Sequence, residues 1–173
     1  MRLELLATKH RSLAVTACEW RAFGLDDPER LADAVFDRLL KNPDPSFADF
    51  YDAVDLVVHQ AYERQTARTS ILERFTSNLS IGNKDAENDV LLALSQLRNK
   101  HRVLLQLRYW DGLTEAEAAE ALRLTPDAFA ERQSKAEARF TNRLAKRRPE
   151  LATAPLGPTV ASAKPGVHYR RRD

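Results

Sequence analysis

Residues 107–144, LRYWDGLTEAEAAEALRLTPDAFAERQSKAEARFTNRL, contain the signals that decide the fold of this chain. Gly112 is placed to end one helix, because glycine adopts the left-handed conformation at a helix C-terminus with little steric cost. Thr114 and Glu117, three residues apart, form a capping box that opens the next helix. The sequence therefore predicts a sharp break between two helices at residues 111–114.

A second helix boundary follows closely. Thr125 is a favourable N-cap and Pro126 suits the first helical position, where its missing amide proton is not needed, so a long helix is expected to about Lys146. Ala118 and Ala119 on the preceding short helix allow another helix to cross closely. Two helices joined by such a tight turn form the helix-turn-helix motif, which places its second helix in a DNA major groove.

The long helix carries both a core pattern and side chains suited to DNA. Phe129, Ala136 and Phe140 form its predicted buried face. Basic and amide side chains donate hydrogen bonds to phosphates and base edges. The residues of this kind are Arg132, Gln133, Lys135, Arg139 and Arg143. An ordinary solvated helix face stays open as the alternative, because Glu131 and Glu137 dilute the positive charge.

Helical spacing also governs the rest of the chain. One apolar stripe begins after Asp85 with Val90 and Leu91, and another ends at Trp110, with a break near Asn99. In the N-terminal half, the segment 26–29 (DDPE) predicts a helix start, and the segment 42–45 (NPDP) predicts its end. The apolar positions between them are Leu31, Val35, Phe36, Leu39 and Leu40. The next helix, the third from the N-terminus, is expected over residues 46–65.

These patterns predict an all-α chain with two small helical domains and almost no strand. The first domain spans residues 1–65, and a polar linker spans 66–84. The helix-turn-helix domain spans 85–148, and the remainder, 149–173, is expected to be a disordered basic tail because it is rich in Pro, Ala, Thr and Ser.

Charge is distributed unevenly along the 173 residues. Residues 1–80 hold ten basic and thirteen acidic side chains, whereas residues 98–148 hold twelve basic and seven acidic. Any nucleic-acid surface is therefore expected in the second half of the chain.

Several classes of function and location are not favoured by the composition. Cys18 is the single cysteine, so neither a disulfide nor a cysteine metal site is expected, and a reducing cytoplasm is the natural compartment. No stretch approaches the roughly 20 apolar residues of a membrane span, and the N-terminus lacks a signal-peptide core, so no membrane insertion is expected. Without a Gly-rich phosphate loop or a metal-spaced His set, we expect no enzyme, cofactor or metal.

The segment from Leu94 to Leu144 resembles the promoter-recognition domain of bacterial RNA polymerase sigma factors. The segments DDPERLADAVFDRLL (26–40) and FADFYDAVDLVVHQAYER (47–64) resemble the first domain of the extracytoplasmic-function (ECF) group of these factors. The resemblance implies two helical domains that bind core polymerase, the first melting the minus-10 region and the second recognising the minus-35 element of promoter DNA.

The same resemblance implies roles for particular residues. Thr125, Arg132, Gln133, Lys135 and Arg139 correspond to the DNA-facing part of the recognition helix. The residues that correspond to the helix docked on the polymerase clamp are Leu31, Val35 and Phe36.

The chain departs from the family pattern in its third helix. Where the family places Arg and Asn for DNA melting, this chain has Ala53, Asp55, Leu56 and Val57, and keeps only Arg64. Two hypotheses follow: an atypical ECF sigma factor, or a sigma-like regulator without minus-10 engagement. The second would act by binding an anti-sigma factor, core polymerase or another regulatory protein.

Overall fold

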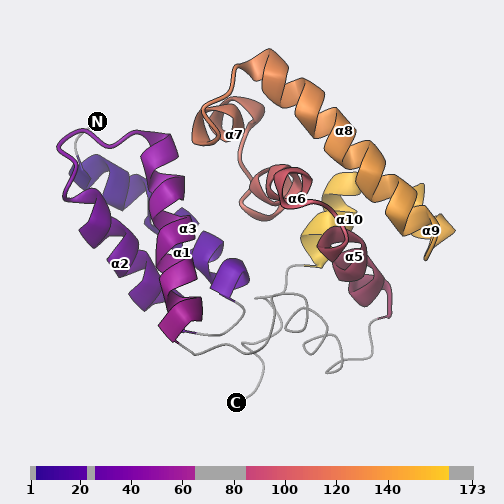
Figure 1. Ribbon diagram of the computed structural model, residues 1–173, viewed down its shortest axis with the longest axis horizontal. Coiled ribbons are helices and arrows are strands. Elements are labelled where there is room, and N and C mark those ends of the chain that lie inside the picture. Colours follow the sequence, from indigo (N-terminus) through magenta and orange to yellow (C-terminus); the bar gives the residue numbers. More distant parts are fainter. Residues whose placement is uncertain (1–2, 23–25, 65–84, 164–173) are drawn as a thin grey trace. The chain divides into compact units, whose positions relative to one another are not determined.

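The computed structural model describes residues 3–22, 26–64 and 85–163, with side chains from residue 10 in the first range and from residue 89 in the last. Every regular element in these ranges is a helix, which confirms the predicted all-α class (Figure 1). The chain divides into two compact units, an N-terminal first unit and a C-terminal second unit. The predicted linker, residues 66–84, lies outside the described residues.

The first unit consists of α1 (Leu3–Ala22), α2 (Pro28–Leu39) and α3 (Phe47–Arg64). The start of α2 is capped by Asp27, whose carboxylate accepts a hydrogen bond from the N–H of Glu29 at 3.2 Å. The start of α3 has a reciprocal cap: the Ser46 hydroxyl accepts from the N–H of Asp49, and the Asp49 carboxylate accepts from the N–H of Ser46. Both starts agree with the predicted boundaries.

An aromatic cluster forms the core of the first unit. Phe50 is fully buried, and its ring centroid lies 5.8 Å from that of Phe47 and 5.3 Å from that of Tyr51. Cys18 and Trp20 of α1 are buried as well. The three helices therefore bury their apolar faces against one another.

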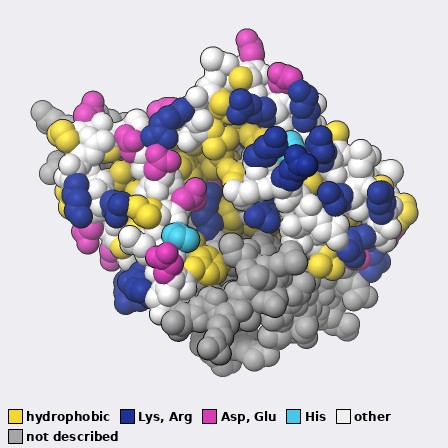
Figure 2. All heavy atoms as spheres, viewed as in Figure 1, with side chains coloured by type: hydrophobic (Ala, Val, Ile, Leu, Met, Phe, Trp, Pro, Cys, Tyr) yellow, Lys and Arg dark blue, Asp and Glu magenta, His cyan; other side chains and the backbone are white. Residues whose placement is uncertain are grey.

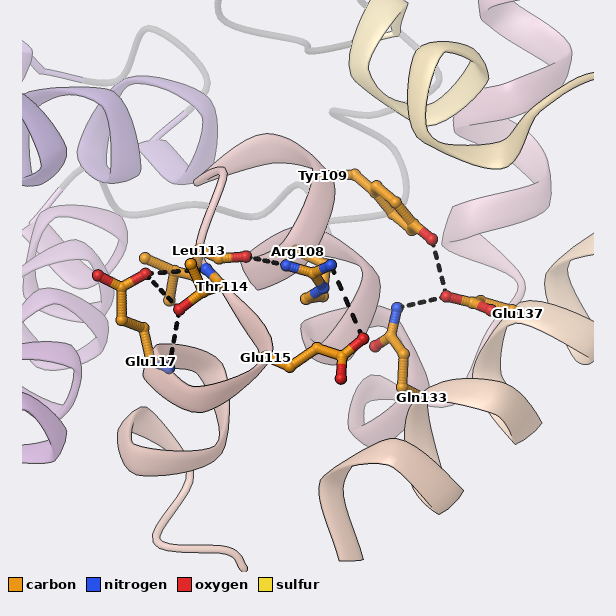
Figure 3. A network of polar contacts seen from close by, with 8 residues as sticks. All are labelled: Arg108, Tyr109, Leu113, Thr114, Glu115, Glu117, Gln133 and Glu137. Atoms are coloured by element: carbon orange, nitrogen blue, oxygen red, sulfur yellow. Dashed lines mark hydrogen bonds and ion pairs between the residues drawn. The ribbon is translucent and has the colours of Figure 1, made fainter. Parts of the chain in front are cut away.

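The second unit contains α5 (Asp85–Ser95), α6 (Asn99–Leu105), the π-helical turn η2 (Gln106–Trp110), α7 (Glu115–Ala121), α8 (Pro126–Ala145), α9 (Pro149–Ala152) and α10 (Leu156–Ser162). The predicted capping box is present: the Thr114 hydroxyl accepts from the N–H of Glu117, whose carboxylate accepts from the N–H of Thr114 (Figure 3). Gly112 has φ +72°, as its place after the helix predicts. The π-helical turn, in which the N–H of Asp111 donates to the Gln106 carbonyl, was not expected from the sequence.

The turn between α7 and α8 has four residues. Arg123 adopts φ 53°, the left-handed conformation that favours glycine, at a cost on the order of 1 kcal/mol. The N–H of Leu124 donates to the Ala119 carbonyl at 2.9 Å, and the Thr125 hydroxyl accepts from the N–H of Ala128 at 3.3 Å. These bonds end α7 and begin α8 at the predicted positions.

The C-terminal segment differs from the prediction. Residues 149–163, expected to be part of a disordered tail, form α9 and α10, and α10 contacts both η2 and α5. The Trp110 indole N–H donates to the Val160 carbonyl at 2.8 Å, and Val160 and Ala163 are fully buried. The prediction was wrong for these residues because their amino-acid composition does not show that the rest of the second unit provides a surface on which they pack. Residues 164–173 lie outside the described residues.

Candidate nucleic-acid interface

Helix α8 has a buried face and an exposed basic face. Its buried residues, which hold it in the second unit, are Phe129, Gln133, Ala136, Phe140 and Leu144. A second row of exposed residues, each three or four positions from the next, consists of Arg132, Lys135, Arg139, Arg143 and Lys146. Residues at this spacing share one face of a helix. We call this row the basic stripe.

Most charges of the basic stripe are not neutralised by the protein. Lys135 pairs with Glu131 one turn earlier, and this hydrogen bond lowers the pKa of Glu131. Arg143 lies 3.5 Å from the side-chain oxygen of Gln96, the residue that follows α5. In the described part of the chain, the other three members of the stripe form no ion pair with a carboxylate. The stripe therefore presents positive charge to an anion from solution.

The positive region extends from α8 to the start of α6. The pKa of His101 is lowered, first by burial and then by the positive charges of Arg139, Lys100 and Arg98. His101 is therefore neutral at pH 7, and the charges around it are basic. Figure 2 shows Lys and Arg side chains gathering over the region where α6 and α8 lie in Figure 1.

A polar groove of about 620 Å³ lies along the C-terminal half of α8. Its lining residues are Gln96, Arg139, Asn142, Arg143, Lys146 and Arg147. Sequence analysis singled out Arg139 and Arg143 as DNA contacts but missed Gln96 and Asn142. The helical spacing from Arg139 could have indicated Asn142, whereas Gln96 lies in the turn after α5 and reaches the groove only through tertiary packing. We call this feature the α5–α8 groove.

Gln133 lies on the buried face of α8 and not on the basic stripe, and its role as a DNA contact stays a prediction. Only 6% of the residue is exposed, and its amide nitrogen donates to the Glu137 carboxylate at 2.8 Å. The Tyr109 hydroxyl donates to the same carboxylate oxygen at 2.7 Å (Figure 3). Gln133 is inward because it continues the spacing of the buried residues Phe129 and Phe140.

The Tyr109–Glu137 hydrogen bond predicts a pH-dependent stability. Burial, and then the bond to Glu137, raise the pKa of Tyr109 from 10.0 to about 12. Because the folded state favours the neutral phenol, this contribution is complete below pH 10.0 and is lost as the pH rises towards 12. In urea unfolding across this range, we expect Tyr109→Phe to lose less stability than the wild-type chain. In absorbance titration, one of the four tyrosines should ionise late in the folded wild type and not in this variant. Equal loss of stability in both chains would contradict the assignment.

The other predicted DNA contacts remain exposed. Arg132, Lys135, Arg139 and Arg143 lie together on the basic stripe, although Lys135 shares its charge with Glu131. Thr125 is also exposed, and its hydroxyl already accepts the capping hydrogen bond of α8. Thr125 therefore offers its hydroxyl proton, not its capping lone pair, to a ligand.

The predicted polymerase-docking residues are inside the first unit. Leu31, Val35 and Phe36 are 1%, 0% and 8% exposed, because they form the buried face of α2. They stabilise the three-helix core, and their role in docking on polymerase stays a prediction. The exposed face of α2 carries Glu29 and Asp33, which both pair with Arg11 of α1.

The exposed charges of α3 are mostly acidic. Asp52, Asp55 and Glu63 are exposed, with Arg64 as a basic exception at the end of the helix. Asp55 lies 3.5 Å from the Arg21 guanidinium. This surface repels a phosphate backbone, in contrast to the basic stripe of α8.

Within the described residues, no group of three or more His, Cys, Asp or Glu side chains is arranged to hold a metal ion. None of the described helices combines the length and the apolar character that crossing a membrane requires.

The chain matches no protein-family model, no curated protein and no solved structure.

Proposed function

We propose that this chain is an atypical ECF-type RNA polymerase sigma factor of the cytoplasm. Its second unit binds promoter DNA through α8, and its first unit contributes to binding core polymerase. The observation that carries the proposal is the basic stripe, which is exposed on a long helix that follows a four-residue turn. A helix presented in this way has the geometry of a recognition helix in the major groove.

The two ends of α8 have different tasks in this proposal. Arg132, near the N-terminal end, is within the part of a recognition helix that reaches base edges, and an Arg guanidinium donates two hydrogen bonds to guanine. Later members of the stripe are suited to phosphates, which attract any positive charge regardless of sequence. Arg132 therefore contributes to specificity, and the rest mainly to affinity.

The Arg132→Ala substitution tests this function. We expect the affinity for the preferred duplex to fall by about 1–3 kcal/mol and the base preference to relax at one position, because a base-edge donor is removed. Selection from a randomised duplex library, followed by sequencing, measures both effects. Arg38→Ala, which removes an exposed arginine from α2, is the control and should leave the preference unchanged. If Arg132→Ala selects the same duplexes with the same affinity as the wild type, the proposed role of α8 is wrong.

The acidic surface of α3 favours a second candidate function. A protein with Asp52 and Asp55 exposed on this helix is poorly suited to hold melted DNA, so the chain would be a sigma-like regulator. It would bind an anti-sigma factor, core polymerase or another regulatory protein. Transcription assays with core polymerase and genomic fragments separate the two: initiation supports the sigma factor, and polymerase binding without initiation supports the regulator.

A further inference from the structure

The α5–α8 groove has a composition suited to one class of ligand. Four of its six lining residues are basic, and the other two, Gln96 and Asn142, have amide groups that donate hydrogen bonds. None of the lining residues is hydrophobic, so every side chain in the groove ends in a charged or amide group. Guanidinium and ammonium groups with neighbouring amides are the donors that bind phosphate oxygens.

The charge in the groove is only partly offset by the protein. Asp89 of α5 lies 3.8 Å from Arg147 and 2.7 Å from Arg148, so one carboxylate faces two arginines. Within the described residues, Arg139, Arg143 and Lys146 have no carboxylate at ion-pair distance. The groove therefore keeps a net positive charge that favours an anion with several oxygens.

The position of the groove along α8 indicates which phosphates it meets. Arg132 and Lys146 are fourteen residues apart, which corresponds to about 21 Å along the helix axis. The major groove of B-DNA is only about 12 Å wide. When Arg132 faces base edges, the C-terminal half of α8 thus extends beyond the major groove towards the flanking sugar–phosphate backbone.

We propose that the α5–α8 groove binds the sugar–phosphate backbone of duplex DNA beside the site that Arg132 recognises. That the ligand is duplex DNA rests on the proposed function. The contact with the backbone does not depend on the base sequence. Gln96 acts as a positioning residue, because its side-chain oxygen accepts a hydrogen bond from Arg143 across the groove. The groove increases affinity for any duplex and leaves base preference to the start of α8.

The double variant Arg143→Gln/Lys146→Gln tests this site. Both side chains are exposed, so the substitutions remove charge without opening the core. Binding of a fluorescein-labelled duplex of scrambled sequence is measured by anisotropy between about 50 and 200 mM salt. We expect the affinity at low salt to fall roughly tenfold or more, and the slope of log affinity against log salt to flatten by about 1–2, because two phosphate contacts are lost.

Two further variants separate charge at this site from charge in general. Arg38→Gln/Lys41→Gln removes the same charge from exposed positions of the first unit and should retain the wild-type slope. The charge-preserving swap Arg143→Lys/Lys146→Arg should restore most of the affinity, whereas a purely structural role would not be rescued in this way.

The outcomes distinguish this inference from the proposed function. If the wild type binds the duplex and the groove variant has the same affinity and slope, the groove inference is overturned while DNA binding stands. The same conclusion follows if the control variant flattens the slope equally, or if the charge-preserving swap does not restore binding. If the wild type binds neither scrambled nor selected duplexes at low salt, the proposed function itself fails, and the groove assignment fails with it.

Discussion

Replacing Trp110 with alanine is expected to lower the free energy of unfolding of the second unit by about 3–5 kcal/mol, the range for truncating a large buried aromatic side chain. Trp110 is only 1% exposed, so its removal leaves a cavity next to η2. The substitution also removes the donor of the bond to the Val160 carbonyl, which ties α10 to the unit. We therefore expect α10 to detach before the rest of the second unit unfolds.

Urea unfolding followed by circular dichroism measures the loss of stability, and limited proteolysis measures the protection of residues 149–163. Trp110→Phe is the matched variant, because it keeps an aromatic ring and mainly loses the hydrogen bond, worth about 1 kcal/mol. A loss below about 1 kcal/mol for Trp110→Ala, with α10 still protected, would show that the ring is not part of a packed core.

The Phe50→Ala substitution is expected to destabilise the first unit by about 3–5 kcal/mol for the same reason. Phe50 is fully buried, and its ring lies within 6.3 Å of the Phe36 ring as well as next to Phe47 and Tyr51. Alanine removes these aromatic contacts from α2 and α3 together. The rings on both helices then face a cavity that they can fill only by moving.

The loss of stability of the first unit is measured by Trp20 fluorescence in a chain that also carries Trp110→Phe. Trp20 and Trp110 are the two tryptophans of the chain, so the signal then comes from the first unit alone. Leu40→Ala is the control, since Leu40 is 63% exposed and its truncation should change stability by less than about 0.5 kcal/mol. Similar unfolding midpoints for Phe50→Ala and Leu40→Ala would falsify the assignment of Phe50 to the core.

The proposed DNA contact and the stability of the second unit depend on opposite faces of one helix. Phe140 and Leu144 are fully buried, whereas Arg139 and Arg143 beside them are exposed. A substitution on the buried face therefore acts through folding, and one on the basic stripe acts through charge. Measuring stability and duplex affinity for the same variants keeps these effects apart.

Local interactions explain which parts of the fold followed from the sequence. The capping box of Thr114 and Glu117 and the N-cap of Thr125 each involve residues at most three positions apart. Their hydrogen bonds form wherever the helix forms, so the sequence alone determined where α7 and α8 begin. The exposed basic residues of α8 were found for the same reason, since three- and four-residue spacing defines a face.

Only the tertiary structure decided which faces are buried and which distant residues meet. Leu31, Val35 and Phe36 matched a docking pattern, yet they pack inside the first unit because α1 and α3 cover them. Gln133 lies inward, where its amide nitrogen donates to the Glu137 carboxylate, which also accepts from the Tyr109 hydroxyl.

The same distinction explains the C-terminal segment and the α5–α8 groove. Residues 149–163 have only three large apolar side chains, those of Leu151, Leu156 and Val160, but Val160 gains a buried site beside Trp110, fifty positions earlier in the chain. Gln96 meets Arg143 only because α5 packs against α8. The capped starts of α7 and α8 depend on neighbours along the chain and were determined by sequence, whereas burial and the groove depend on residues far apart in sequence, whose contacts form only when the chain folds.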